Sequence, residues 1–186
     1  MAKRHLLSST AQGSFFDIPS DIASLERYYV LATDDLDLIV SRRGAENRLG
    51  LAIHIALLRH PGQGWRDNDQ IPPEVIHWLS EQIHVSTSAL DIYGNRESTR
   101  AAHRVLAIKH LGLRPFLRED FRTALELATQ AAFGTDEGAA IMRRLLAGLS
   151  EAKLVYPGIV TLERIGLAGR ARARRLAAQD LNDALS

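Results

Sequence analysis

Signals that start and stop helices follow one another along this chain, with almost no strand pattern between them. Proline in the first turn and Ser, Thr or Asp at the cap start helices, while glycine after the last turn ends them. Start signals are Ile18-Pro19-Ser20, Thr33-Asp34-Asp35, Pro72-Pro73 and Thr135-Asp136-Glu137; stop signals are Gly44, His60-Pro61-Gly62, Gly112 and Pro157-Gly158. This succession predicts an all-α fold, a helical bundle of two packed helix-turn-helix-like subdomains.

One of the predicted helices is apolar almost all round, from Leu49 to Leu58. Such a helix is typically buried at the centre of a core. The polar loop of residues 62–71 that follows it is the candidate boundary between subdomains. We therefore expect four parts: a flexible tail (residues 1–14), two helical subdomains (15–62 and 63–156) and a C-terminal helical segment (157–186) with a bend near Gly166 and Gly169.

The composition excludes several classes of protein. The 186 residues include no cysteine, which excludes disulfides, zinc fingers and thiol nucleophiles. No apolar run approaches the roughly 18 residues of a membrane span, so we expect a cytoplasmic protein without a membrane partner.

Neither the histidines nor the clustered aspartates predict a metal site. His77 and His84, like His103 and His110, are seven positions apart, about 10 Å along a helix, which is too far to share a metal ion. We expect them to be surface or interface histidines. Three aspartates are clustered, Asp34, Asp35 and Asp37. They fit a helix cap and a solvated first helical turn better than a metal site. The sequence thus predicts no catalytic residue, no metal and no cofactor.

Charge is arranged in blocks although the net charge is only +1. Basic segments at residues 42–66, 96–122 and 164–178 alternate with acidic ones, and 20 of the 23 basic residues are arginine. A fold that gathers the basic segments on one side would bind nucleic acid, because guanidinium groups bind phosphate bidentately. The alternatives are a solvated surface with local ion pairs and an arginine content that only reflects a GC-rich genome.

The first candidate binding site is the turn RRGAEN between two predicted helices. Arg42 and Arg43 end one helix, while Asn47 and Arg48 lie in the first turn of the next. A helix N-terminus offers free N–H groups to phosphate, and these side chains would assist it. We expect Arg43 and Arg48 to hold phosphates and Asn47 to reach a base edge, unless Asn47 only makes a local hydrogen bond at the helix start.

The second candidate is the predicted helix 96–111, followed by further arginines. Four side chains at i, i+4, i+7 and i+8 would form one basic face of this helix: Arg96, Arg100, His103 and Arg104. Arg114 and Arg118 follow beyond the helix. Val105, Ile108 and Leu111 would pack the opposite face into the core. A rigid helix of this kind could place Arg100 and Arg104 against guanine edges in a major groove. The alternative is a solvated basic face that only follows the DNA backbone.

Three motifs occur in a fixed order from Phe15 onward: RRGxxNRLGxA with LLRxPG, YxxRxxTRxxH with LGxRPF, and PGxxTLER. In this order the chain resembles the N-terminal region of Tn-three-type replicative transposases. The resemblance implies a helical part that binds double-stranded DNA sequence-specifically at the terminal inverted repeats of a transposon. It also implies that the acidic catalytic triad lies in an RNase-H-like domain far downstream, so that this chain is not an enzyme by itself.

As the targeting part of a transposase, the chain would be associated with a bacterial nucleoid and form homodimers through regions outside this sequence. A function of a different class is a helical protein-interaction or dimerisation module without DNA affinity of its own. That module predicts a large exposed apolar patch and little salt dependence. DNA binding predicts a contiguous arginine surface and a steep salt dependence.

Overall fold

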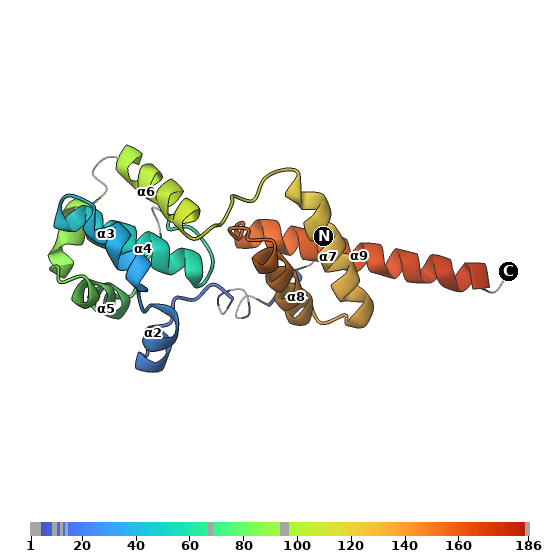
Figure 1. Ribbon diagram of the computed structural model, residues 1–186. Coiled ribbons are helices and arrows are strands. Elements are labelled where there is room, and N and C mark those ends of the chain that lie inside the picture. Colours follow the sequence, from blue (N-terminus) through green and yellow to red (C-terminus); the bar gives the residue numbers. More distant parts are fainter. Residues whose placement is uncertain are drawn as a thin grey trace. The chain divides into compact units, whose positions relative to one another are not determined.

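The computed structural model describes residues 5–8, 11, 13, 15–66, 69–93 and 97–184. Every regular element within these residues is a helix (Figure 1), which confirms the all-α class. The helix-turn-helix form of the subdomains stays a prediction. Across the described residues, no helix combines the length and the apolar character needed to cross a membrane.

The chain divides into two compact units at positions that differ from the predicted boundaries. Unit 2 is the continuous stretch Phe16–Arg114, while unit 1 combines Met1–Phe15 with Pro115–Ser186. The loop of residues 62–71, expected between subdomains, therefore lies within unit 2. Trp65 gives the physical reason, because its indole stacks on Tyr93 with ring centroids 5.6 Å apart and holds the loop to that unit.

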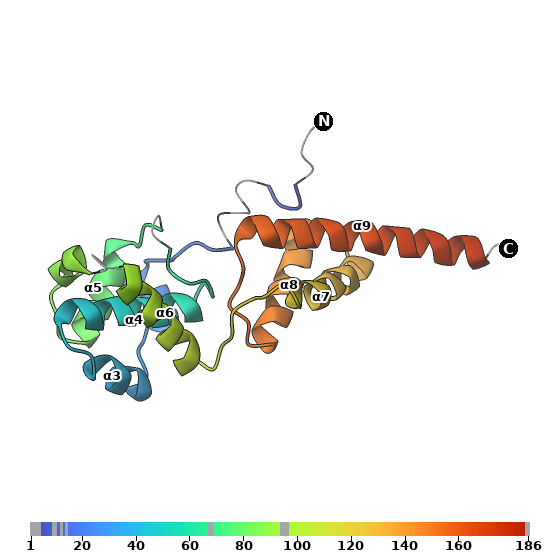
Figure 2. The ribbon, with the colours of Figure 1, turned by 90° about the horizontal axis from the view of Figure 1, so that it is seen from above.

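Unit 2 is built around α4 (Ala45–Arg59), in which every residue from Leu49 to Leu58 is buried. The prediction of a central buried helix is therefore confirmed. Four helices pack on α4: α3 (Thr33–Val40), α5 (Pro73–Gln82), the 3-10 helix η1 (Thr87–Ile92) and α6 (Glu97–His110). Figure 2 shows α4 among them, and α2 (Ile22–Tyr28) precedes them in the chain.

Local chemistry sets the helix starts in unit 2. The Asp21 side chain accepts a hydrogen bond from the Ser24 N–H at 3.0 Å, so α2 begins after this cap rather than at the predicted Pro19. The chain enters α4 through Gly44, whose φ of 84° lies in the left-handed region that favours glycine. Gly44 thus permits the tight turn that sets Arg42 and Arg43 beside the start of α4.

Unit 1 consists mainly of α7 (Asp120–Gly134), α8 (Gly138–Glu151) and α9 (Ile159–Ala184), which pack on one another. The end of α9 extends past α7 and α8 (Figures 1 and 2). α9 continues as one helix through both glycines at which a bend was predicted. Gly169 instead allows close packing, because a Cβ there would lie 2.6 Å from the Cβ of Ala128.

Two residues of the predicted flexible tail belong to the core of unit 1. Leu6 and Leu7 are both buried. The Leu7 N–H donates to Glu163 Oε1 at 3.2 Å. Leu6 packs so closely on α9 that a Cβ on Gly166 would lie 2.3 Å from its Cδ2 atom. These contacts tie the start of the chain to α9, which the local sequence does not reveal.

Candidate nucleic-acid interface

The turn between α3 and α4 holds its arginines in different ways. Arg42 donates to Ser41 Oγ from Nε and Nη2, at 3.1 and 2.9 Å. Arg48 donates from Nε to the Arg42 carbonyl at 2.9 Å and so closes the end of α3. Arg43 is exposed. Arg48 therefore has a structural role in this turn, and phosphate binding by Arg42, Arg43 and Arg48 stays a prediction.

Asn47 makes the local hydrogen bond that was the alternative to a base contact. Its Nδ2 donates to the Arg43 carbonyl at 2.8 Å and to Glu46 Oε1 at 3.1 Å. These bonds stabilise the first turn of α4. A contact between Asn47 and a base stays a prediction.

On α6 the faces differ from the prediction. His103, expected on the exposed basic face, is 8% exposed, while Val105, expected in the core, is 65% exposed. The side of α6 that packs on α4 contains His103 and Ala107, because polar partners satisfy the histidine there. Arg104 is exposed and Arg100 is half-buried. Arg96 lies outside the described residues.

The partner of His103 is Tyr93, at the end of η1. The Tyr93 hydroxyl and His103 Nδ1 share a hydrogen bond of 2.9 Å. The Tyr93 ring stacks on both Trp65 and His103, at 13° and 10° between ring planes. Gly50 of α4 makes room for this ring, since a Cβ there would lie 2.1 Å from it. This aromatic stack was not predicted; Trp65 stands in a polar loop and gives no local signal.

Asp35 ties α3, α4 and α6 together. Its fully buried carboxylate accepts hydrogen bonds from the Arg59 Nη1 and Nη2 atoms at 2.5 and 2.8 Å, from His110 Nε2 at 2.7 Å and from the Ala32 N–H at 2.7 Å. Burial alone raises the pKa of a carboxyl, but the bonds from Arg59, His110 and Ala32 together hold the pKa of Asp35 below its usual value. The predicted helix start is present, but its cap residue is Ala32, whose N–H donates to Asp35, and the prediction of a solvated carboxylate is wrong for Asp35.

The expectation of surface histidines is likewise wrong on α6. His103 is buried against Tyr93, and His110 is half-buried against Asp35. Within the described residues, no group of three or more His, Asp or Glu side chains could hold a metal ion.

The two basic segments of unit 2 lie near each other across the α3–α4 turn and α6. Burial lowers the pKa of His103, and the charge of Arg42 lowers it further. Burial also lowers the pKa of His54, and the charges of His103, Arg104 and Arg100 lower it further, to about 3. Arg66 of one segment and Arg100 and Arg104 of the other line the same pocket, so arginines from both segments share one region of unit 2.

The remaining predicted arginines are exposed and belong to different units. Arg114 ends unit 2, and Arg118 precedes α7 in unit 1. In α9, Arg174 forms an ion pair with Asp136, so part of the third basic segment is neutralised within unit 1.

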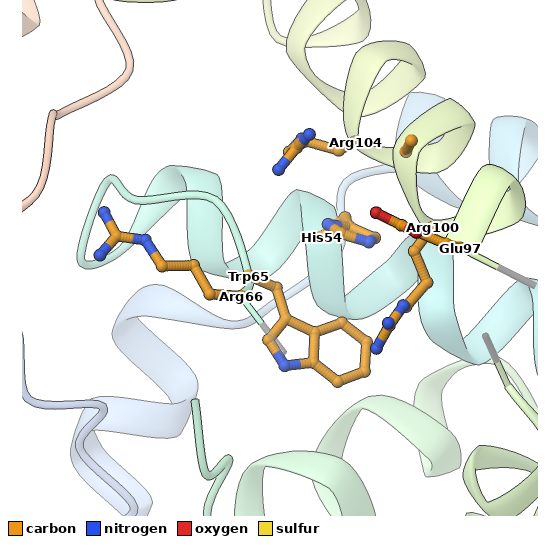
Figure 3. A pocket seen from close by; sticks show the side chains of 7 residues that line it. His54, Trp65, Arg66, Glu97, Arg100 and Arg104 are labelled. Atoms are coloured by element: carbon orange, nitrogen blue, oxygen red, sulfur yellow. The ribbon is translucent and has the colours of Figure 1, made fainter. Parts of the chain in front are cut away.

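A pocket of 170 Å³ opens between α4, α6 and the loop that carries Trp65 (Figure 3). It is lined by His54, Trp65, Arg66, Glu97, Arg100, Ala101 and Arg104. The residues combine aromatic rings with three guanidinium groups, next to the predicted DNA-reading face of α6.

Fold and site together define an all-α protein with a cluster of arginines around one buried helix. The chain belongs to the family described as a domain of unknown function (DUF4158), whose model matches residues 6–168. This places the observed helices of both units, up to the middle of α9, within one family domain.

The chain is also similar to transposases over most of its length. It is 34% identical over 175 residues to the transposase for transposon Tn501 of Pseudomonas aeruginosa, covering 94% of this chain and 18% of that protein. It is 31% identical over 185 residues to the transposase for transposon Tn3926 of Escherichia coli, covering 100% and 19%. For the transposase for transposon Tn1546 of Enterococcus faecium, the identity is 33% over 172 residues, covering 92% and 17%. The chain thus spans less than a fifth of the length of these relatives, and the resemblance seen in the motifs is confirmed.

Proposed function

We propose that this chain binds double-stranded DNA sequence-specifically at the terminal inverted repeats of a transposon, as the targeting part of a transposase. The observation that carries the proposal is the convergence of arginine-bearing segments in unit 2: α3 and α6 both pack on α4, His110 of α6 bonds Asp35 of α3, and Arg66, Arg100 and Arg104 line one pocket. The similarity to transposases gives this basic region its context.

In this proposal the arginines divide into two roles. Arg42, Arg43 and Arg48 hold phosphates where α4 begins, since guanidinium groups and helix N-termini both favour anions. Arg100 and Arg104 on α6 reach base edges in the major groove. Arg114 and Arg118 add phosphate contacts. His103, being buried, acts as a positioning residue that fixes α6 through Tyr93.

Catalysis, in this proposal, belongs to parts of the relatives' length that this chain does not span, as does formation of homodimers. The bound state is associated with the bacterial nucleoid. The chain alone is then expected to retard DNA in a gel-shift assay without cutting it.

The proposal is tested by measuring the affinity of the chain for the ends of the transposon and for scrambled DNA over a range of salt concentrations. With roughly six to eight phosphate contacts, log affinity should fall with log salt at a slope near −5 to −7. A footprint on the inverted repeats should accompany it. A slope near zero with no footprint would instead favour a protein-interaction module.

A further inference from the structure

The pocket beside α6 has a polar floor that the fold leaves unused. His54 forms this floor and is only 1% exposed. Neither of its ring nitrogens has a hydrogen-bond partner among the described residues. Buried polar atoms are nearly always paired, and an unpaired one is costly, so this exception needs an explanation.

The protonation state of His54 defines what could satisfy it. Burial, reinforced by the charges of His103, Arg104 and Arg100, lowers the pKa of His54 to about 3, so the ring is neutral at pH 7. A neutral imidazole offers one N–H donor and one acceptor nitrogen. This pair suits a neutral heterocycle with its own donors and acceptors better than it suits a bare anion.

The wall of the pocket is aromatic and held in place. The Trp65 ring lies 5.4 Å from His54 between centroids and stacks on Tyr93, which in turn stacks on His103. Three successive rings with nearly parallel planes restrict the motion of the indole. Aromatic side chains fixed in this way are the usual platforms for nucleic-acid bases, because every base has a π-face.

The rim is cationic. Figure 3 shows the guanidinium groups of Arg66, Arg100 and Arg104 around Trp65 and His54. Glu97 is the carboxylate in the lining, so three positive charges face one negative charge. Such a rim favours an anionic group attached to whatever ring enters the pocket.

The volume limits what lies inside the pocket to one base, so any sugar or phosphate attached to that base would lie at the rim. At 170 Å³ the pocket is below the roughly 300–1,000 Å³ of sites for drug-sized molecules. It is too small for stacked bases of an oligonucleotide.

We propose that this pocket binds a single nucleotide, with the edge of its base toward His54, beside Trp65, and its phosphate among Arg66, Arg100 and Arg104. The nucleotide comes either from solution or from a DNA strand whose base has left the helical stack. The first source needs no DNA interface; the second rests on the proposed function, with Arg100 and Arg104 on the phosphate of one unstacked nucleotide in place of base edges in the groove.

Fluorescence of Trp65 tests the pocket directly. Trp78→Phe leaves Trp65 as the remaining tryptophan, and Trp78 Nε1 has no hydrogen-bond partner in the described part of the chain that this change would break. The full chain carrying this substitution is titrated with deoxynucleoside 5′-monophosphates, ribose 5-phosphate and inorganic phosphate. We expect the nucleotides to quench the Trp65 fluorescence and to bind with an affinity at least tenfold higher than that of ribose 5-phosphate or inorganic phosphate.

Two variants and a control assign the effect to the pocket. His54→Phe keeps a ring but removes both nitrogens, and Arg104→Ala removes an exposed cation without disturbing the core. Each substitution should lower the affinity for the nucleotide at least fivefold. Arg143→Ala, which replaces an exposed arginine of α8, should leave this affinity unchanged. Because Arg104 is exposed, its variant keeps the test valid if His54→Phe unfolds.

DNA containing 2-aminopurine at each position of one inverted repeat distinguishes the two sources. A rise in 2-aminopurine fluorescence that Arg104→Ala abolishes identifies DNA as the source, and quenching by free nucleotides identifies solution. Equal affinity for inorganic phosphate and nucleotides, or no response in either arm, would overturn the proposal. Gel shifts on the same duplexes report DNA binding separately, so failure of the pocket and failure of the proposed function give different results.

Discussion

Replacing Asp35 removes the group on which α3, α4 and α6 converge, and Asp35→Ala should lower the free energy of unfolding by about 3 kcal/mol. The carboxylate is fully buried and accepts four hydrogen bonds, three of them from Arg59 and His110. Breaking a buried ion pair by removing one partner costs roughly 3–5 kcal/mol. The Arg59 side chain is 33% exposed and so remains partly solvated after the change, which places the loss at the lower end.

Urea denaturation followed by circular dichroism measures this loss, and Asp34→Ala is the matched control. Asp34 is the neighbouring acid in the same first turn, but it is exposed, so its removal should cost only about 0.3–1 kcal/mol through the helix dipole. Equal losses for the two variants would refute the reasoning, because burial and pairing would then contribute nothing.

The pH dependence gives an independent measure of the same group. Hydrogen bonds hold the pKa of Asp35 below its usual value in the folded state. A group of this kind contributes its full stabilisation above its unfolded pKa of about 3.9 and loses it as the pH falls through the folded pKa. The stability difference between wild type and Asp35→Ala should therefore be constant near neutral pH and shrink below about pH 4. A difference that grows on acidification would contradict the assigned pairing.

Three further substitutions test the interface and its support. Arg43→Ala combined with Arg48→Ala should weaken binding to all DNA sequences alike, with a loss of about 1 kcal/mol in stability because Arg48 bonds a backbone carbonyl; sequence-selective weakening would contradict the phosphate role. Arg104→Ala should narrow the affinity gap between inverted-repeat and scrambled DNA by about tenfold, and parallel losses at one fixed salt concentration would exclude base reading. Gly50→Ala should destabilise the chain by about 1–3 kcal/mol and change the near-ultraviolet circular dichroism, because a Cβ displaces the Tyr93 ring; an unchanged spectrum would disprove this packing.

The sequence predicts the features of this fold that depend on neighbouring residues. Caps and glycine stops are local, so the all-α class followed from them. The burial of α4 could also be predicted, because a helix that is apolar all round has no face to turn toward water.

The inner face of α6 could not be predicted, because hydrophobicity points to the wrong side of this helix. Its buried residues are His103 and Ala107, and His103 and His110 are stabilised by Tyr93 and Asp35. Asp35 lies 75 positions from His110, so only the folded chain reveals that pairing. Val105 was assigned to the core for the same reason that the histidines were assigned to the surface.

The pocket could not be predicted because its lining residues are far apart in the sequence and none of them alone indicates a binding site. His54 stands in an apolar helix, Trp65 in a polar loop and Arg104 on a helix that already had a proposed role. Their meeting depends on Gly50, which admits the Tyr93 ring that holds Trp65 in place. A glycine inside a helix is a recognisable sign of close approach, but it does not identify the approaching ring.

The burial of Leu6 and Leu7 has a consequence for how the chain is synthesised. Leu7 and its partner Glu163 are 156 positions apart. At about 5–20 residues per second, a ribosome needs roughly 8–30 s between the two. During that time unit 2, which is continuous in sequence, emerges whole, while the two leucines remain in water without their covering helix. We expect unit 2 to resist protease on arrested nascent chains before unit 1 does, and the leucine pair to be open to chaperones until α9 leaves the exit tunnel.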